Sequence, residues 1–126
     1  MKKQISLPAL LKKAQNEFNK FIRNRDQDKG CISSGTTVEQ AGHFYSAGQY
    51  TALRFNEDNC HGQSLQDNYF KHGNLIPYRM NLIKRIGQQR VDLLDYTATR
   101  NRVKKWTRFE LEQIYQLYKN KNNSNK

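Results

Sequence analysis

The sequence is short of cysteine, of acidic residues and of long apolar runs, and each shortage excludes a class of protein. Two cysteines among 126 residues cannot form a disulfide framework, which favours a reducing compartment. No apolar run approaches the roughly twenty residues that a membrane span needs. The run from Ile5 to Leu11 is interrupted by Ser6 and Pro8, and no cleavage site follows it, so it does not resemble a secretory leader. We therefore expect a cytoplasmic protein that has no membrane partner.

The shortage of acidic residues makes the chain strongly basic. It has 22 Lys and Arg against 11 Asp and Glu, which gives a formal net charge of +11. Such an excess opposes compaction and favours polyanionic partners. The charge indicates nucleic acid first, while a membrane surface, an acidic protein or a merely solvated basic surface remain alternatives.

The chain length predicts one domain, which we place at residues 1–120, followed by a disordered basic tail at residues 121–126. Apolar residues at helical spacing predict a first amphipathic helix from Pro8 to Arg25. Between Cys31 and Gln49, glycines at short intervals with β-branched and aromatic residues favour short strands and turns. Thr51–Phe55 is expected to be a second short strand.

Three more helices are expected along the rest of the chain. The polar segment Asn56–Lys71 is predicted to form one short helix. Another begins after the capping residue Asn74 and ends at Gly87, with an extension after that break. Thr107 and Glu110, at capping-box spacing, start the last one. The expected fold class is α+β, with a small hairpin region between N- and C-terminal amphipathic helices.

One constellation of residues points to chemistry. His43 lies in the segment EQAGHFYSAGQY; Asn59 follows sixteen residues later, Asn68 nine beyond it, and His72 four beyond that. If Asn56–Lys71 is helical, the last step places Asn68 and His72 on one helix face, where their lone pairs could hold a cation. His43 could then take a proton from water in phosphodiester hydrolysis, with Asn59 as a brace and Mg²⁺ stabilising the charge on the phosphate.

Each of these residues also has a structural interpretation. A lone histidine is more often a hydrogen-bonded structural residue, and this is the reading we favour for His61, which has no partner in the constellation. His72 could simply favour a helix C-terminus through the macrodipole. Asparagine is abundant in the chain, so the spacing by itself leaves both interpretations open.

The surrounding residues resemble the HNH, or ββα-metal, nuclease motif, in which a hairpin histidine precedes a central asparagine and a His or Asn on a helix. More specifically, the chain resembles the phage NinG (Rap) recombination-protein family. The resemblance is carried by KKAQNEFNKFIRNRDQDKGCIS, AGHFYSAG, LRFNEDNCHGQ and GNLIPYRMNLIKRIGQQRVDLL, in one order over about residues 12–94.

The resemblance implies a small ββα-metal core, made of a β-hairpin plus a helix, and a metal-dependent endonuclease that acts on branched recombination intermediates such as Holliday junctions and D-loops. It matches His43 to the base, Asn59 to the central asparagine and Asn68 to the helix metal ligand; His72 fits the second helix ligand of some HNH nucleases. Mg²⁺ or another divalent cation is the implied cofactor, branched DNA the implied partner, and the host cytoplasm the implied location. The alternative is a catalytically inactive DNA-binding accessory protein.

Two departures from the family pattern affect the metals. The family has a CxxC before the motif and a second CxxC on the helix, the spacing of a four-thiolate zinc site. Here CISS keeps Cys31 but has Ser34, and SLQD has Ser64 and Asp67 in the cysteine places, so we predict no structural zinc. Gly42 stands where many HNH nucleases carry a metal-binding side chain, so the catalytic ion is expected to keep many waters.

Branched DNA is recognised through its shape and its phosphates, so basic side chains should carry most of the contact. Trp106, which lies among cations, could stack on unpaired bases or anchor the last helix. A homodimer would suit a two-fold symmetric junction, and RNA is a third, weaker alternative as the partner. The candidate cations lie on the first helix, on the helix after Asn74 and in the segment before Trp106: Lys12, Lys13, Arg23, Arg25, Arg79, Lys84, Arg85, Arg100, Arg102, Lys104 and Lys105.

Overall fold

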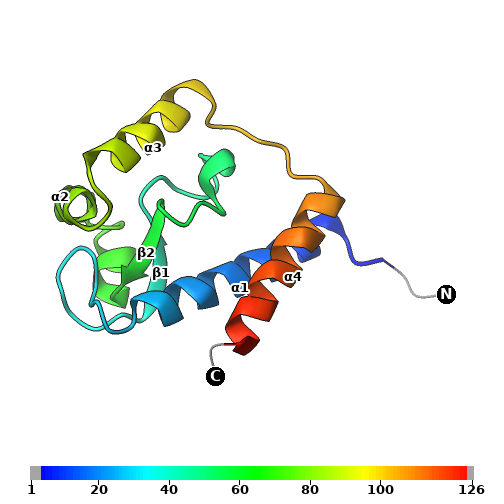
Figure 1. The fold of residues 1–126 in the computed structure, drawn as a ribbon, viewed down its shortest axis with the longest axis horizontal. Helices are drawn as coiled ribbons and strands as arrows, with labels where there is room; N and C mark the ends of the chain where they lie inside the picture. The colour runs from blue at the N-terminus through cyan, green and yellow to red at the C-terminus, as the bar shows by residue number, and fades with distance from the viewer. Residues whose placement is uncertain (1–3, 125–126) are drawn as a thin grey trace.

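The computed structural model describes residues 4–124 and has a mixed α+β fold that is mostly helical (Figure 1). Within these residues, one two-stranded antiparallel sheet lies between helices. None of the helices in this part of the chain is long and apolar enough to cross a membrane. In chain order, the elements are α1 Leu7–Asp26, β1 Gln40–His43, the 3₁₀ turn η1 Thr51–Leu53, β2 Cys60–Gln63, the π-helical turn η2 Gln66–Phe70, α2 Leu75–Ile86, α3 Gln88–Arg100 and α4 Arg108–Ser124.

The first helix, α1, confirms the amphipathic helix predicted at Pro8–Arg25. Ser6 caps it by accepting a hydrogen bond from the Ala9 N–H at 3.2 Å, and Pro8 falls in the first turn, where its missing N–H has no intrahelical partner to lose. Its buried stripe includes Phe18 and Ile22, which pack against α4 and one face of the sheet. Figure 1 shows α4 crossing α1 on the side away from α2 and α3.

The hairpin differs from the prediction in its second strand. Thr51–Phe55 is not a strand, because η1 forms there instead, and the predicted helix at Asn56–Lys71 is wrong because β2 lies inside it. All four residues of β2 are buried, and the ring of His61 and the Nε2 group of Gln63 find hydrogen-bond partners inside the protein. A strand buried on both faces, yet rich in polar residues, has neither the alternation nor the apolar run by which strands are recognised in sequences.

In the paired register, His43 lies opposite Cys60 and Gly42 lies opposite His61. Neighbouring residues on a strand point to opposite faces, so His43 and Cys60 share the face toward α1, while Gly42 and His61 share the other. Consistent with this, the Phe18 ring of α1 lies 6.2 Å from that of His43, and the ring of Tyr78 in α2 lies 6.2 Å from that of His61.

The helices after the hairpin follow the predictions more closely. α2 ends at Ile86, and the φ of 90° at the following Gly87 lets the chain turn into α3, the predicted extension. Asn74 is the N-cap residue of α2, but its side chain donates to Asp67 at 2.9 Å and caps nothing. A second apolar cluster, formed by Tyr78 and Leu82 with residues of α3 and of the loops, holds this half together.

The last helix confirms the capping box. The Glu110 N–H donates to the Thr107 hydroxyl at 3.2 Å, and the Thr107 N–H donates to the Glu110 carboxylate at 3.0 Å. The tail predicted to be disordered from residue 121 instead continues α4 to Ser124. Asn122 is buried and donates to both the backbone oxygen and the carboxylate of Glu17 on α1, which explains why these polar residues are ordered. Residues 125–126 of that predicted tail lie outside the described residues.

Candidate functional site

His43 ends β1 and keeps one ring nitrogen free of protein partners within the described chain. Its Nε2 lies 2.9 Å from the backbone oxygen of Arg54. Because a carbonyl oxygen only accepts hydrogen bonds, Nε2 carries the proton and Nδ1 carries the lone pair. Burial lowers the pKa of His43 below its ordinary value, and the Arg54 carbonyl opposes this only partly. The ring is therefore neutral at pH 7, which is the state a general base requires.

His43 lines a pocket of about 330 Å³, and His72 lines the same pocket. His72 is exposed, and its φ of 50° places it in the left-handed region just after η2. Asn68 and His72, which were predicted to share one helix face, do not share one, because η2 ends at Phe70. His72 lies in an irregular turn after η2 and lines the pocket from there. The residues that line the pocket are His43, Phe44, Tyr45, Ser46, Gln49, Tyr50, His72 and Leu75.

Asn59 acts as a brace behind this pocket. Its side chain is fully buried, with Nδ2 donating to the backbone oxygens of Tyr45 at 2.9 Å and Leu53 at 3.1 Å, while Oδ1 accepts from the Tyr45 N–H at 2.9 Å. These bonds close the loop between β1 and β2, the loop that carries the Arg54 carbonyl. Asn59 therefore holds the loop beside His43, and its own side chain is fully buried.

The wall of the pocket includes a contact that sequence reasoning missed. Tyr45 donates its hydroxyl proton to Asp95 on α3, and Arg79 on α2 binds the same carboxylate with two hydrogen bonds of 3.0 and 2.7 Å. Burial and the Asp95 carboxylate raise the pKa of Tyr45 to about 12. The three residues fix the pocket loop to both helices. Nothing in the sequence marked Asp95, because a carboxylate half-way along an amphipathic helix is ordinary.

Asn68, the predicted metal ligand, lies apart from the other candidates. It is not among the residues that line the pocket, and its amide donates to Gln40 Oε1 at 2.6 Å. Gln40 and His43 are three positions apart on β1 and so point to opposite faces. The structure therefore brings His43 and His72 together and leaves Asn68 outside their pocket.

The pocket does not fit a Mg²⁺ site built from its own side chains. Mg²⁺ takes oxygen ligands and usually one or two carboxylates, yet no Asp or Glu lines the pocket. In residues 4–124 there is no cluster of three or more His, Cys, Asp or Glu side chains able to hold a metal ion. A side chain at Gly42 would have to displace Gln63, because a Cβ there would stand 1.7 Å from Gln63 Oε1. The imidazole of His72 is a ligand type that suits Zn²⁺ or Ni²⁺ better than Mg²⁺.

The four positions of the family zinc pattern meet in the fold around one carboxylate, which we call the Asp67 centre. Asp67 Oδ2 accepts from the Cys31 thiol at 3.2 Å and from the Ser64 hydroxyl at 2.8 Å. Burial alone would raise the pKa of Asp67, but hydrogen bonds, that of Ser34 first, hold it well below its usual range. One thiol, two hydroxyls and one carboxylate do not fit a structural zinc site. The Asp67 centre holds the loop after α1 against η2 instead.

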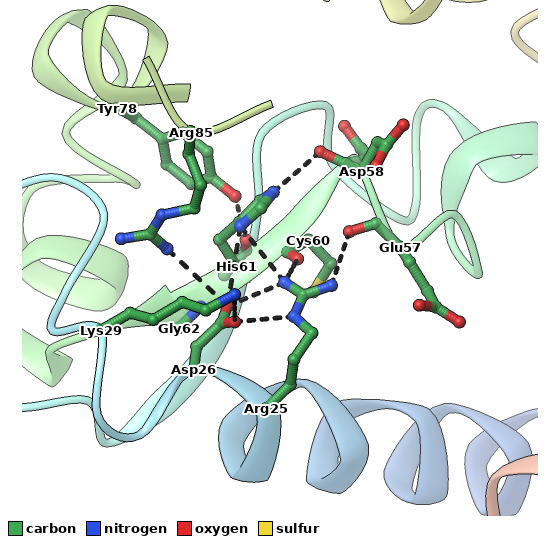
Figure 2. Close-up of polar contacts among 12 residues, drawn as sticks. Arg25, Asp26, Lys29, Glu57, Asp58, Cys60, His61, Gly62, Tyr78 and Arg85 are labelled. Atoms are coloured by element: carbon green, nitrogen blue, oxygen red, sulfur yellow. Dashed lines mark hydrogen bonds and ion pairs between the residues drawn. The ribbon is translucent and has the colours of Figure 1, made fainter. Parts of the chain in front are cut away.

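A second buried carboxylate joins α1 to β2 and forms what we call the Asp26 centre (Figure 2). Asp26 is fully buried, and Arg25 binds it with two hydrogen bonds, Nε at 2.7 Å and Nη2 at 2.8 Å. The backbone N–H of Gly62 donates to the same carboxylate at 2.8 Å. Burial alone would raise the pKa of Asp26, but the Arg25 and Gly62 hydrogen bonds hold it below its usual value.

His61 belongs to the Asp26 centre, which fits the structural reading of this residue. Its Nε2 lies 3.1 Å from the backbone oxygen of Asp58 and must donate to it, so Nδ1 accepts from Arg25 Nη2 at 3.2 Å. Burial and the Arg25 charge lower the pKa of His61 to about 4, so the ring is neutral at pH 7. Arg25 also donates to the backbone oxygens of Glu57 and Cys60, which gives this predicted DNA contact a structural role.

The other predicted DNA-binding cations divide by their partners. Arg79 is bound to Asp95, Lys104 to Glu110 at 2.8 Å, and Arg102 donates to the backbone oxygen of Gln49 at 3.2 Å. Trp106 donates to the Thr51 carbonyl at 2.9 Å and packs against Phe55, the contacts of a helix anchor. No side-chain hydrogen bond within residues 4–124 engages the remaining cations: Lys12, Lys13, Arg23, Lys84, Arg85, Arg100 and Lys105.

The comparisons with known proteins agree on one family. The sequence model described as "Bacteriophage Lambda NinG protein" matches residues 2–126. The chain is 44% identical over 114 residues to Protein ninG of Escherichia phage lambda, covering 88% of this chain and 54% of that protein. It is 45% identical over 107 residues to Protein ninG of Enterobacteria phage H19B, covering 82% and 52%. Protein ninG of Salmonella phage P22 is 42% identical over 114 residues, covering 88% and 55%.

This chain thus spans about half the length of these curated relatives. No solved structure matches it significantly. The family match covers nearly the whole chain, including the hairpin, the pocket of His43 and both buried carboxylate centres. The chain belongs to the NinG family.

Proposed function

We propose that this chain is a DNA endonuclease of the HNH type that cuts branched recombination intermediates, such as Holliday junctions and D-loops, in the host cytoplasm. The observation that carries the proposal is the state of His43: Nε2–H is held by the Arg54 carbonyl, Nδ1 has no partner in residues 4–124, and His43 and His72 line one pocket. The net charge of +11 and the resemblance to the NinG family support DNA as the substrate.

In the proposed reaction, His43 takes a proton at Nδ1 from the water that attacks the phosphodiester. The Arg54 carbonyl fixes the tautomer, and Asn59 holds the loop that carries that carbonyl. Because its pKa lies below 6.5, His43 is mostly unprotonated at neutral pH and available as the base. His72 lies at the same pocket and is the second residue whose loss should lower the cleavage rate.

The divalent cation that the family resemblance implies has no carboxylate ligand in this pocket, so we assign no step to it. When bound, such an ion would stabilise the charge that builds up on the phosphate. This missing ligand set favours one alternative function, a DNA-binding accessory protein that has lost catalysis. A homodimer on a two-fold symmetric junction is compatible with either function.

The deciding experiment incubates the purified chain with a synthetic four-way junction and, separately, Mg²⁺, Mn²⁺, Ni²⁺ or Zn²⁺. The wild type, His43→Ala and His72→Ala are compared for both binding and cutting, with single-stranded RNA as a competitor. Metal-dependent cutting by the wild type that falls at least about a hundredfold in His43→Ala would support the endonuclease. Binding by all three proteins with cutting by none would establish the accessory function. Cutting by wild type and His43→Ala alike would show that His43 is not the base.

A further inference from the structure

A second pocket, of about 460 Å³, lies at the far end of α2 from His43. We call it the Lys29 pocket. It is formed by the segment that follows α1 and by the last turn of α2, and its lining contains three cations and no carboxylate. The lining residues are Lys29, Cys31, Ile32, Ser33, Ser34, Gly35, Asn81, Lys84 and Arg85.

The three cations keep their donors free. Within residues 4–124, the side chains of Lys29, Lys84 and Arg85 make no hydrogen bond, and Arg85 Nη1 is shielded from solvent without a partner. Lys29 Nζ and Arg85 Nη1 lie 3.7 and 3.9 Å from the oxygens of Asp26, too far for a hydrogen bond. Figure 2 shows both side chains reaching toward this carboxylate from different elements.

Asp26 does not neutralise the pocket, because its charge is already matched by Arg25. Arg25 and the Gly62 N–H donate three hydrogen bonds of 2.7–2.8 Å to the carboxylate. Asp26 therefore draws Lys29 and Arg85 toward each other without consuming their donors. Two or more positive charges remain at the mouth of the pocket, which is the arrangement that binds a phosphate.

The helix macrodipole explains the position of only two of these three cations. Lys84 and Arg85 lie in the last turn of α2, where cations are favoured by the helix macrodipole. That effect does not account for Lys29, which follows α1 and approaches from the opposite side, nor for the hollow that the three side chains share.

We propose that the Lys29 pocket binds a phosphodiester of the DNA strand, as an anchor separate from the pocket of His43. The proposal rests on the proposed function for its substrate class, DNA. Leu75 lines the first pocket and Arg85 the second, and ten helical residues separate them by about 15 Å. That distance equals roughly four base-pair steps measured along the axis of B-DNA. One duplex arm can therefore contact both pockets.

The test compares two double variants that each remove two positive charges. Lys29→Gln with Lys84→Gln changes exposed side chains of the pocket and leaves in place the three hydrogen bonds that Arg25 and the Gly62 N–H donate to Asp26. The matched control, Lys20→Gln with Lys119→Gln, changes two exposed lysines on α1 and α4. Binding to a four-way junction is measured in EDTA over a series of salt concentrations, so that cutting does not interfere.

We expect the pocket variant to bind at least about tenfold more weakly at 100 mM salt and to lower the log–log salt slope by about 1, while the control changes affinity by less than about threefold. Lys29→Arg with Lys84→Arg should keep the wild-type affinity. Equal losses in the pocket and control variants would overturn the proposal.

Inorganic phosphate gives a readout that does not depend on DNA or on catalysis. In the wild type, phosphate should shift the amide NMR signals of residues 29–35 in a saturable way, and the shifts should vanish in the Lys29→Gln, Lys84→Gln variant. A chain that fails to cut DNA but shows these shifts would contradict the nuclease and support the pocket. A chain that cuts DNA without any saturable shift in this segment would support the nuclease and overturn the pocket.

Discussion

His43 and His61 lie on neighbouring strands of one hairpin, yet the regions around them differ in kind. In the Asp26 centre, both ring nitrogens of His61 bond to protein atoms and the side chain is 3% exposed. In the His43 pocket, one ring nitrogen of His43 bonds to the Arg54 carbonyl, and the residue lines a hollow. Burial lowers the pKa of both rings. A lowered pKa therefore does not distinguish the two histidines. His43 is the candidate base because its Nδ1 has no partner in residues 4–124 and because the residue lines a pocket.

The Asp26 and Asp67 centres have no free carboxylate oxygen, whereas the His43 pocket has no carboxylate. Every oxygen of Asp26 and Asp67 is engaged by donors of the chain, so neither can take a substrate. The pocket of His43 contains no carboxylate at all. We expect the two centres to control stability and the pocket to control activity.

The largest effect should come from Asp26→Ala, which tests whether the Asp26 centre is structural. The substitution leaves the Arg25 guanidinium and the Gly62 N–H without their shared acceptor, and we expect the free energy of unfolding to fall by about 3–5 kcal/mol. Urea denaturation followed by circular dichroism measures it. The control is Asp28→Ala, an exposed residue close by in the chain, which should change the value by less than about 0.5 kcal/mol. Equal losses would remove the contrast between the two regions.

The Asp67 centre permits a gain-of-function test. Because Cys31, Ser34, Ser64 and Asp67 already converge, Ser34→Cys, Ser64→Cys and Asp67→Cys together should bind one Zn²⁺ per chain. With free zinc at a hundred times its dissociation constant, the free energy of unfolding should rise by about 2.7 kcal/mol. Zinc titration and thermal melts with and without chelator measure this. The wild type is the control, and a triple variant that binds no zinc would show that the four positions are not tetrahedrally arranged.

Replacing His61 or His43 by alanine should change the free energy of unfolding by a smaller amount. His61→Ala removes the acceptor of an Arg25 hydrogen bond and a buried ring, so it should cost about 2 kcal/mol more stability than His43→Ala, which changes a half-buried residue with one hydrogen bond. Cutting of the four-way junction should follow the reverse order once both variants are assayed well below their melting temperatures. If His43→Ala were the more destabilising substitution, His43 would belong to the core and not to a site.

The sequence predicted the parts of the fold that depend on local rules. Phe18 and Ile22 recur at helical spacing, and the Thr107 and Glu110 pair obeys the capping rule, so α1 and α4 were correctly placed. β2 was missed because His61 and Gln63 are polar, and only contacts with residues distant in the sequence make their burial tolerable.

The sequence likewise predicted some residues of the candidate site and missed others. The sequence predicted Asn59 as a brace at the foot of a helix. In the structure it lies just before β2 instead, and its side chain bonds to the backbone of the β1–β2 loop. His72 shares the pocket with His43, but through a left-handed turn instead of the assumed helix face. Lys29 was not singled out, because only the approach of α2 to the end of α1 gives this surface lysine a pocket.

The smallest effect concerns the pH dependence of stability. The pKa of His61 is about 4 in the folded state, below the ordinary value of 6.5 that applies to the unfolded chain. The unfolded state therefore binds a proton first as the pH falls, so stability is complete above pH 6.5 and decreases toward pH 4. Between pH 7 and pH 6 this one residue should account for a loss of about 0.7 kcal/mol.

The measurement is the free energy of unfolding of the wild type and of His61→Gln at pH 7, 6 and 5. Glutamine does not titrate, so the free energy of unfolding of His61→Gln should fall about 0.7 kcal/mol less between pH 7 and pH 6 than that of the wild type. His43→Gln should also make the pH dependence shallower, because the pKa of His43 is lowered too. Asp26, whose lowered pKa acts only at more acidic pH, stays charged throughout. Parallel curves for the wild type and His61→Gln would mean that His61 accepts a proton inside the fold as easily as in water. The ring would then be open to solvent, and the contrast with His43 would disappear.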